Sequence, residues 1–467
     1  MNIFRRHKNN KRKQNNQSGL RLISLGGWGT VTQNLFAYQY NNEILIIDCG
    51  VGFPEEETTR GDLLVADVDY LVRNREKIKG IIITHGHEDH YGGLPFILPK
   101  LNRKIPIYAS RLTTALIKEK LDEYGQSVEI NLIDSREKVN LGSFNLDFIY
   151  LTHSIPDTFG VAIKTPIGTI LHMGDYKFDW TPVMGSISDV GKIATIGNQG
   201  VVCLVSDCLR SEKAGFTLSE AMVEDSLERE MRNCRGRVLI TTISSNVSRW
   251  QQALNVSVKY NRKVILVGRS IEKIFKIASR LGYLNIPKET IVPMKKLNSL
   301  PKEKVSLFVA GSQAQTGSAL DRITRGEYKG LEIQPDDKVV FSSPDYIPGT
   351  QLAINKLVDN LSRQGADVAY SDILDDLHVS GHAAQGDLAL MIGLARPYYL
   401  VPIGGAFRQM RQYALLAERM GYREEEIILP NRNDTVEMTA KGQVKIGSPL
   451  IGKTHLVKSR SNRRKHR

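Results

Sequence analysis

One short segment constrains this chain more than any other: residues 84 to 90 read Thr-His-Gly-His-Glu-Asp-His, directly after an apolar, strand-like run. His85 and His87 can point the same way from an extended loop. Asp89 and His90, where the chain turns into a helix, can face a second ion beside the first. Imidazole and carboxylate donors suit Zn²⁺ or Mn²⁺. The segment therefore predicts a metal site rather than a solvated loop on which histidines merely cluster.

Further candidate ligands stand where other predicted strands end. Asp48 closes the run Ile-Leu-Ile-Ile, His153 follows Tyr-Leu-Thr, and Asp175 follows His-Met-Gly. Each alone is more typical of a turn or a satisfied core group. Together with the 84 to 90 segment they predict a dinuclear set, with Asp175 bridging and Asp48 steadying the ligands from behind. The predicted assignment is His85, His87 and His153 on one ion, and Asp89 and His90 on the other.

The net charge of +13 is concentrated at the two ends of the chain. Residues 1 to 17 carry six Lys and Arg, residues 452 to 467 carry seven, and neither segment contains an acid. Because both are polar and almost free of apolar residues, we expect disordered basic arms that attract polyanions without reading sequence, or that simply aid solubility. No apolar run approaches the length of a membrane helix, and no signal peptide is visible, which predicts a cytoplasmic protein.

The pattern of predicted elements divides the chain. The first 212 residues read mainly as short apolar strands, whereas from about 213 helices and strands alternate, which is typical of a parallel sheet. After about 373, predicted strands at 375–379 and 398–402 flank a helix near 384–396. This organisation predicts more than one domain.

Several separate stretches of the chain form recognisable motifs: Thr84 to His90, Thr152 to Asp157, Gly174 to Asp179, Ser206-Asp207 with Gly215 to Thr217, Gly311 to Gln313, Ser342 to Pro344 with Ile347 to Gly349, and His378 to Ala383. Together these stretches resemble one family, the β-CASP ribonucleases of the RNase J family within the metallo-β-lactamase superfamily. The resemblance implies an α/β protein: a metallo-β-lactamase αβ/βα sandwich with an inserted β-CASP α/β domain. The expected divisions are a basic arm at 1–18, the sandwich at 19–212 and 373–450, the β-CASP domain at 213–372, and a basic tail at 451–467.

The segment His378-Val379-Ser380-Gly381-His382 suits an RNA phosphate. Ser380 offers a hydroxyl, Gly381 lets the backbone approach an anion, and the helix that follows would aim its free N–H groups at negative charge. His382 can neutralise charge or act as an acid on the leaving oxygen, as the family implies. The alternative is a loop whose histidines cap the helix.

The inserted segment adds two candidate substrate contacts. By resemblance, Ser245 and Asn246 touch the RNA backbone at a strand-to-helix turn. Ordinary N-capping explains a Ser or Asn at such a turn equally well.

The chain departs from the family pattern at two places near the metal site. Where Pro, an apolar residue and His-Gly-Glu are expected, it has Pro402-Ile403-Gly404-Gly405-Ala406, so the histidine expected to complete the second metal's shell is missing. In addition, residues 26 to 34 replace a stretch that is usually Glu-Ile-Gly-Lys. Three protein ligands plus water remain workable for zinc.

These observations predict a metal-dependent RNA phosphodiesterase, acting from the 5′ end of RNA, internally, or both. One or two Zn²⁺ per chain are expected, with Mn²⁺ as the alternative metal. Asp89 would orient or deprotonate the attacking water, and His382 would assist the leaving 3′-oxygen. The expected partners are RNA, favoured when 5′-monophosphorylated, and a second copy or a related paralogue. The alternative is a catalytically weakened RNA-binding partner of an active relative.

Overall fold

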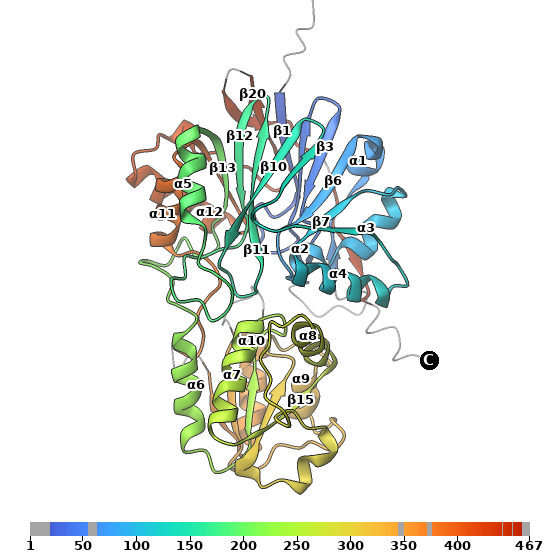
Figure 1. Cartoon of the computed structure of the whole chain (residues 1–467), viewed down its shortest axis with the longest axis vertical. Coiled ribbons are helices and arrows are strands. Elements are labelled where there is room, and N and C mark those ends of the chain that lie inside the picture. Colours follow the sequence, from blue (N-terminus) through green and yellow to red (C-terminus); the bar gives the residue numbers. More distant parts are fainter. Residues whose placement is uncertain are drawn as a thin grey trace, which may run out of the picture.

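The computed structural model describes residues 19–54, 63–343, 350–370, 376–440, 442–450 and 452–459. Figure 1 shows two bodies, one built from both ends of the chain and one from its middle. The predicted basic arm at 1–18, the end of the basic tail at 460–467, and the motif residues 344 and 347–349 lie outside the described residues.

The described part of the larger body is built around two mixed sheets, with a small three-stranded sheet beside them. Among the described residues one sheet runs in the order β21-β20-β1-β2-β3-β6-β7-β8, and the other in the order β19-β13-β12-β11-β10-β9. The first comprises β1 (Gly19–Gly26), β2 (Leu35–Tyr40), β3 (Glu43–Ile47), β6 (Ile78–Ile83), β7 (Ile107–Ala109), β8 (Ile130–Leu132), β20 (Thr435–Thr439) and β21 (Val444–Gly447). The second comprises β9 (Lys138–Leu141), β10 (Phe144–Leu151), β11 (Thr158–Thr165), β12 (Gly168–Met173), β13 (Val201–Asp207) and β19 (Pro397–Ile403).

The two sheets pack face to face because their strands are apolar on both sides. In β2, Phe36 and Tyr38 join the core between the sheets, together with Phe148 of β10, whereas Leu35 and Ala37 belong to the core on the outer side. Helices cover both outer faces, as Figure 1 shows. They are α1 (Asp69–Arg73), α2 (Glu88–Tyr91), α3 (Leu94–Leu101) and α4 (Arg111–Glu123) on one side, and α5 (Val190–Gln199), α11 (Gln385–Ala395) and α12 (Phe407–Arg419) on the other. The predicted αβ/βα sandwich is therefore present.

The second body is the predicted alternation of strands and helices. Its described strands run in the order β15-β16-β14-β17-β18, and every pairing among them is parallel. The chain enters it after β13 and returns from it before α11, so it is an insertion in the sandwich; the boundaries 213 and 372 stay a prediction. Its elements are α6 (Met222–Arg232), β14 (Val238–Thr241), α7 (Val247–Lys259), β15 (Lys263–Val267), α8 (Arg269–Arg280), β16 (Val305–Val309), α9 (Ala319–Thr324), β17 (Lys338–Phe341), α10 (Gln351–Arg363) and β18 (Asp367–Ala369).

A fully buried arginine ties the inserted body to the segments that connect it to the sandwich. The Arg249 guanidinium, on α7, lies 2.7 Å from Glu220 Oε1 and donates to the Oγ of Ser342 at 2.6 Å and to the carbonyl of Leu377 at 3.3 Å. Glu220 lies on the outgoing segment and Leu377 on the returning one. The buried charge of Arg249 therefore holds in place both segments that connect the inserted body to the sandwich.

Two stretches differ from the sequence-based expectation. Residues 376–379, the described part of the predicted strand at 375–379, form a turn and loop, because their backbone serves the Arg249 network instead of a sheet. Within the predicted disordered tail, β22 (His455–Val457) pairs antiparallel with β5 (Leu63–Val65), which in turn pairs with β4 (Val51–Gly52). The prediction of disorder is wrong for this part, since a short apolar run can pair with an open strand edge.

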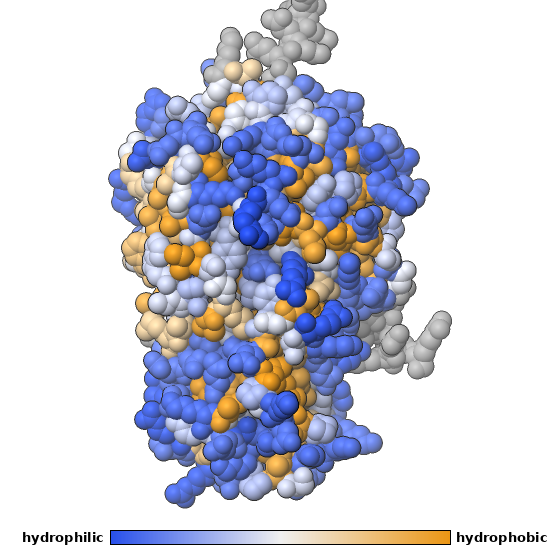
Figure 2. Space-filling model, viewed as in Figure 1, coloured by the Kyte–Doolittle hydropathy of each residue, from blue (hydrophilic) through white to orange (hydrophobic). Residues whose placement is uncertain are grey.

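Among the described residues, no helix has the length and apolar character needed to cross a membrane. On the face seen in Figure 2, hydrophilic residues cover much of both bodies, and the hydrophobic residues form separate groups. Most of the large apolar side chains of the described residues are buried in the interior.

We expect Arg249→Ala to lower the free energy of unfolding by about 3–5 kcal/mol, because it leaves the carboxylate of Glu220 buried and unpaired. Urea unfolding of the purified protein measures this loss. The matched control is Arg229→Ala, which removes an arginine from an exposed pair with Asp376 and should cost less than about 1 kcal/mol. Equal losses in the two variants would contradict the structural role given to Arg249.

Candidate metal centre

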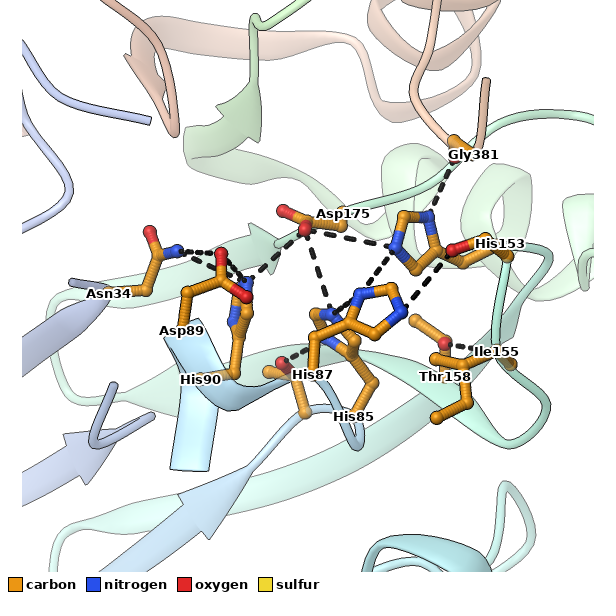
Figure 3. A network of polar contacts seen from close by, with 12 residues as sticks. Asn34, His85, His87, Asp89, His90, His153, Ile155, Thr158, Asp175 and Gly381 are labelled. Atoms are coloured by element: carbon orange, nitrogen blue, oxygen red, sulfur yellow. Dashed lines mark hydrogen bonds and ion pairs between the residues drawn. The ribbon is translucent and has the colours of Figure 1, made fainter. Parts of the chain in front are cut away.

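The ends of six segments from both sheets meet at one edge of the sandwich. The residues at these strand ends are Asp48 after β3, residues 84–90 after β6, His153 after β10, Asp175 after β12, Asp207 at the end of β13, and Gly404 after β19. As the sequence predicts, His85 and His87 lie in an extended loop, whereas Asp89 and His90 lie in the short helix α2. Figure 3 shows the side chains of His85, His87, Asp89, His90 and His153 gathered around Asp175.

The first ligand group is His85, His87, His153 and Asp175. His87 Nδ1 lies 3.1 Å from both His85 Nε2 and His153 Nε2, and Asp175 Oδ2 lies 3.6 Å from His85 Nε2. Burial lowers the pKa of His87 to about 4 and that of His85 well below its usual range, so the imidazoles are neutral at neutral pH. Neutral imidazoles with converging ring nitrogens are the form that binds a metal ion.

The second ligand group is Asp89, His90 and Asp175. His90 Nε2 lies 3.2 Å from Asp175 Oδ2 and 3.5 Å from Asp89 Oδ2. On the other side of the same ring, Nδ1 lies 2.7 Å from the buried Asp48 Oδ2, whose partner Oδ1 accepts from the backbone N–H of Thr84 at 2.8 Å. Asp48 therefore turns Nε2 toward the centre, the supporting contact predicted for it.

Both groups contain the donors that a pair of metal ions requires, so the residues present fit the ions predicted from the sequence. The structure brings together all six predicted ligands, and Asp175 belongs to both groups. The first group offers three nitrogens and one oxygen, and the second offers one nitrogen and two oxygens. Imidazole and carboxylate donors in these numbers suit zinc or manganese.

His382, the predicted acid, lies at the margin of the centre and is held by a carboxylate. Its Nδ1 lies 2.8 Å from Asp207 Oδ2, and its Nε2 lies 4.0 Å from Asp175 Oδ2. Burial alone would lower the pKa of His382, but the carboxylates of Asp207 and Asp175 raise it to about 9. The ring therefore carries a proton at neutral pH. Sequence reasoning gave no role to Asp207, although it ends an apolar strand just as Asp48 and Asp175 follow theirs.

The 378–382 loop contacts the centre directly. The carbonyl of Gly381 lies 2.8 Å from His153 Nδ1, and a Cβ at Gly381 would stand only 2.6 Å from the same atom. Ser380 Oγ accepts from the backbone N–H of His382 at 3.1 Å, and Val379 is buried. Burial, with the positive charges of nearby Arg and Lys side chains, holds the pKa of His378 well below its usual range.

The prediction that α11 aims free N–H groups at an anion is wrong. The N–H of Ala384 donates to Thr217 Oγ1 at 3.0 Å, that of Gln385 to the carbonyl of Lys213 at 3.0 Å, and that of Gly386 to the carbonyl of Gly215 at 2.6 Å. The segment that follows β13 therefore accepts the hydrogen bonds of the N–H groups at the N-terminus of α11. A phosphate at this loop would have to be held by side chains.

At the other predicted substrate contact, Asn246 is the N-cap of α7. Its buried side chain accepts from the backbone N–H of Arg249 at 3.0 Å, as the capping alternative describes, while Ser245 beside it is half-buried. The RNA contacts of Ser245 and Asn246 stay a prediction.

The two stretches that depart from the family pattern lie against each other. The N–H of Gly404 donates to the carbonyl of Gly27 at 2.9 Å, and the fully buried Trp28 forms a β-bridge with Gly405. Gly404 has a φ of 67°, a left-handed conformation that costs other residues roughly 1–2 kcal/mol. The position of the missing histidine and the unusual 26–34 stretch are thus in direct contact.

Three family models match the chain. The beta-lactamase superfamily domain matches residues 43–189, the beta-CASP domain of ribonuclease J matches residues 235–361, and a domain described as the Zn-dependent metallo-hydrolase RNA specificity domain matches residues 371–430. Fold and site together define a metallo-β-lactamase-type hydrolase with an inserted β-CASP domain.

Similarity to named proteins identifies the family more narrowly. Ribonuclease J from Synechocystis sp. is 38% identical over 453 residues, which cover 95% of this chain and 70% of that protein. Ribonuclease J2 from Bacillus subtilis is 36% identical over 440 residues, which cover 94% of this chain and 78% of that protein. The chain belongs to the ribonuclease J family, which confirms the family, the fold class and the hydrolase predicted from the sequence.

A solved structure supports the fold independently. A protein of unknown function from Enterococcus faecalis matches with a TM-score of 0.60 at 15% identity, covering 90% of this chain and 100% of that one. At that identity the likeness concerns the fold alone.

We expect Gly381→Ala to weaken zinc binding by the first ligand group about 10- to 100-fold, because the added methyl displaces His153. Titration of the metal-free protein against a chelating indicator measures the affinity. Gly393→Ala is the matched control: it lies on α11 where a Cβ meets open space, and should leave zinc affinity unchanged. Unchanged affinity in Gly381→Ala would contradict the placement of His153 in the site.

Proposed function

We propose that this protein is a metal-dependent ribonuclease that hydrolyses RNA phosphodiester bonds through the two ligand groups joined at Asp175. The observation that carries the proposal is the shared carboxylate: its Oδ2 lies within 4.0 Å of His85, His90, His153 and His382. Zinc is the proposed metal, with manganese as the alternative. Bound metal ions would lower the pKa of water to near neutrality and offset charge on the phosphate.

The protein's own residues have distinct proposed roles around that chemistry. Asp89 is a partly exposed ligand, with 21% of its side chain accessible, and is proposed to orient or deprotonate the attacking water. His382 is proposed to donate its proton to the leaving 3′-oxygen. Asp207 holds Nδ1 of that ring, which leaves Nε2 facing the centre.

RNA is proposed as the substrate because the family is that of ribonuclease J and because the 378–382 loop touches the centre. That loop lies within the segment matched by the RNA specificity domain. We propose 5′-monophosphorylated RNA as the preferred form, His378 to His382 as its contacts, the cytoplasm as the location, and a homodimer or a complex with a related paralogue as the assembly. The alternative of a catalytically weakened RNA-binding partner is not favoured, since all six predicted ligands converge.

His87→Ala and Asp89→Ala should each lower the rate of RNA hydrolysis on the order of 100-fold or more, because each removes a proposed metal ligand. The assay follows RNA with a labelled 5′-monophosphate. Release of mononucleotides would show exonuclease action, and internal fragments would show endonuclease action. His455→Ala changes an exposed histidine on β22 and should retain the parent rate. Parental rates in the first two variants would refute the proposed function.

A separate prediction concerns the proton donor. His382→Ala should slow hydrolysis about 10²- to 10⁴-fold, the usual contribution of a general acid. His382 shares a third cluster of potential ligand atoms with Asp175 and Asp207. Zinc content, measured on the same samples, should nevertheless remain that of the parent, because the proposed ions lie in the two groups that lack His382. A slow variant that has also lost zinc would instead place His382 among the structural supports of the centre.

A further inference from the structure

Asn34 is a buried amide at the second ligand group. It ends the turn between β1 and β2, and its side chain and backbone together are only 2% exposed. Its N–H donates to the carbonyl of Asp89 at 3.0 Å, and its carbonyl accepts from the N–H of Gly50 at 2.8 Å. The backbone therefore holds Asn34 rigidly beside Asp89.

The side chain of Asn34 points into the second ligand group, as Figure 3 shows. Its Nδ2 lies 3.1 Å from His90 Nε2 and 3.4 Å from Asp89 Oδ2. His90 Nε2 lies 3.5 Å from Asp89 Oδ2 and 3.2 Å from Asp175 Oδ2. Four ligands about 2.0–2.1 Å from a tetrahedral zinc ion stand about 3.3 Å from one another. The amide thus occupies the place of a fourth donor.

The side-chain amide of Asn34 also has an oxygen atom that can act as a metal ligand. Its oxygen and nitrogen exchange places by a half-turn of the side chain, and amide oxygens are ligands of hard divalent cations. Gly404 lies nearby and has no side chain. Its N–H donates to the carbonyl of Gly27, and Gly27 in turn lies against Asn34, since a Cβ built on Gly27 would stand 2.9 Å from Asn34 Oδ1. Position 404 also borders the centre, since a Cβ there would stand 3.5 Å from Asp207 Oδ1.

We propose that Asn34 supplies, through Oδ1, the fourth protein ligand of the second metal ion, replacing the side chain absent at position 404. This inference rests on the proposed metal-dependent function. The second ion would then be held by three oxygens and one nitrogen, and the first by three nitrogens and one oxygen. Because oxygen donors suit Mn²⁺ and imidazole suits Zn²⁺, the two positions differ in metal preference.

The structure leaves one competing role for Asn34, which is to orient Asp89 and His90 by donating hydrogen bonds from its NH₂ group. Two substitutions separate the roles. Asn34→Ala removes both a ligand and a donor. Asn34→Asp keeps an oxygen ligand but cannot donate from an ionised carboxylate, and would repel Asp89 unless a cation lies between them. Asn131→Ala, at the far edge of the eight-stranded sheet, is the matched control.

The experiment titrates metal-free protein with Zn²⁺ and with Mn²⁺, measuring bound metal per chain by mass spectrometry and bound Mn²⁺ by electron paramagnetic resonance. The parent and Asn131→Ala should bind two ions. Asn34→Ala should keep the first ion and bind the second about 10-fold or more weakly. Asn34→Asp should bind the second ion at least as tightly as the parent. Retention of the first ion shows that each variant is folded at the centre.

Two results in the variants would overturn the inference while leaving the proposed function in place. One is equal loss of the second ion in Asn34→Asp and Asn34→Ala, which would make Asn34 a hydrogen-bond donor that positions its neighbours. The other is unchanged binding of both ions in Asn34→Ala. A parent protein that takes up only one ion would likewise overturn it, whereas a parent that takes up none would refute the metal-dependent function itself.

Discussion

The carboxylate of Asp175 is the contact on which the rest of the centre depends. Four imidazoles approach a single oxygen of this buried side chain, and they come from the segments that follow β6 and β10, from α2 and from the loop before α11. Burial raises the pKa of a carboxyl group, but here the neighbouring histidines, above all His90 and His382, hold it well below its usual range. Asp175 is therefore ionised, and its negative charge is what a pair of cations can share.

The sandwich explains why such a contact forms. Because β3, β6, β10, β12, β13 and β19 all end at one edge, the residues that follow them are brought within reach of each other without any long loop. The inserted body lies at this same edge of the sandwich. Its returning segment passes Arg249 and continues directly into the 378–382 loop, where Gly381 touches His153. Through this junction, the packing of the inserted body bears on the position of a proposed metal ligand.

Much of this arrangement was predictable from the sequence, because both sheets and the 84–90 segment have strong local patterns. The six ligands are histidines and aspartates placed directly after apolar strands, and the alternation from 213 onward predicts a parallel sheet. Other features depend on distant contacts. Residues 213–217 satisfy the N-terminus of α11, and the edge of β5 recruits β22. Asn34 and Asp207 were missed as site residues because a single Asn or Asp carries no ligand spacing of its own.

The chain departs from the family pattern at residues 26–34 and at Gly404, and the fold places these two stretches in contact with each other beside the second ligand group. The account as a whole requires two ions that share Asp175. Anomalous X-ray diffraction from crystals grown with zinc tests this most directly. It should show two peaks flanking Asp175, one among His85, His87 and His153, and one among Asp89, His90 and Asn34. A peak away from Asp175, or no peak in either ligand group, would contradict the account.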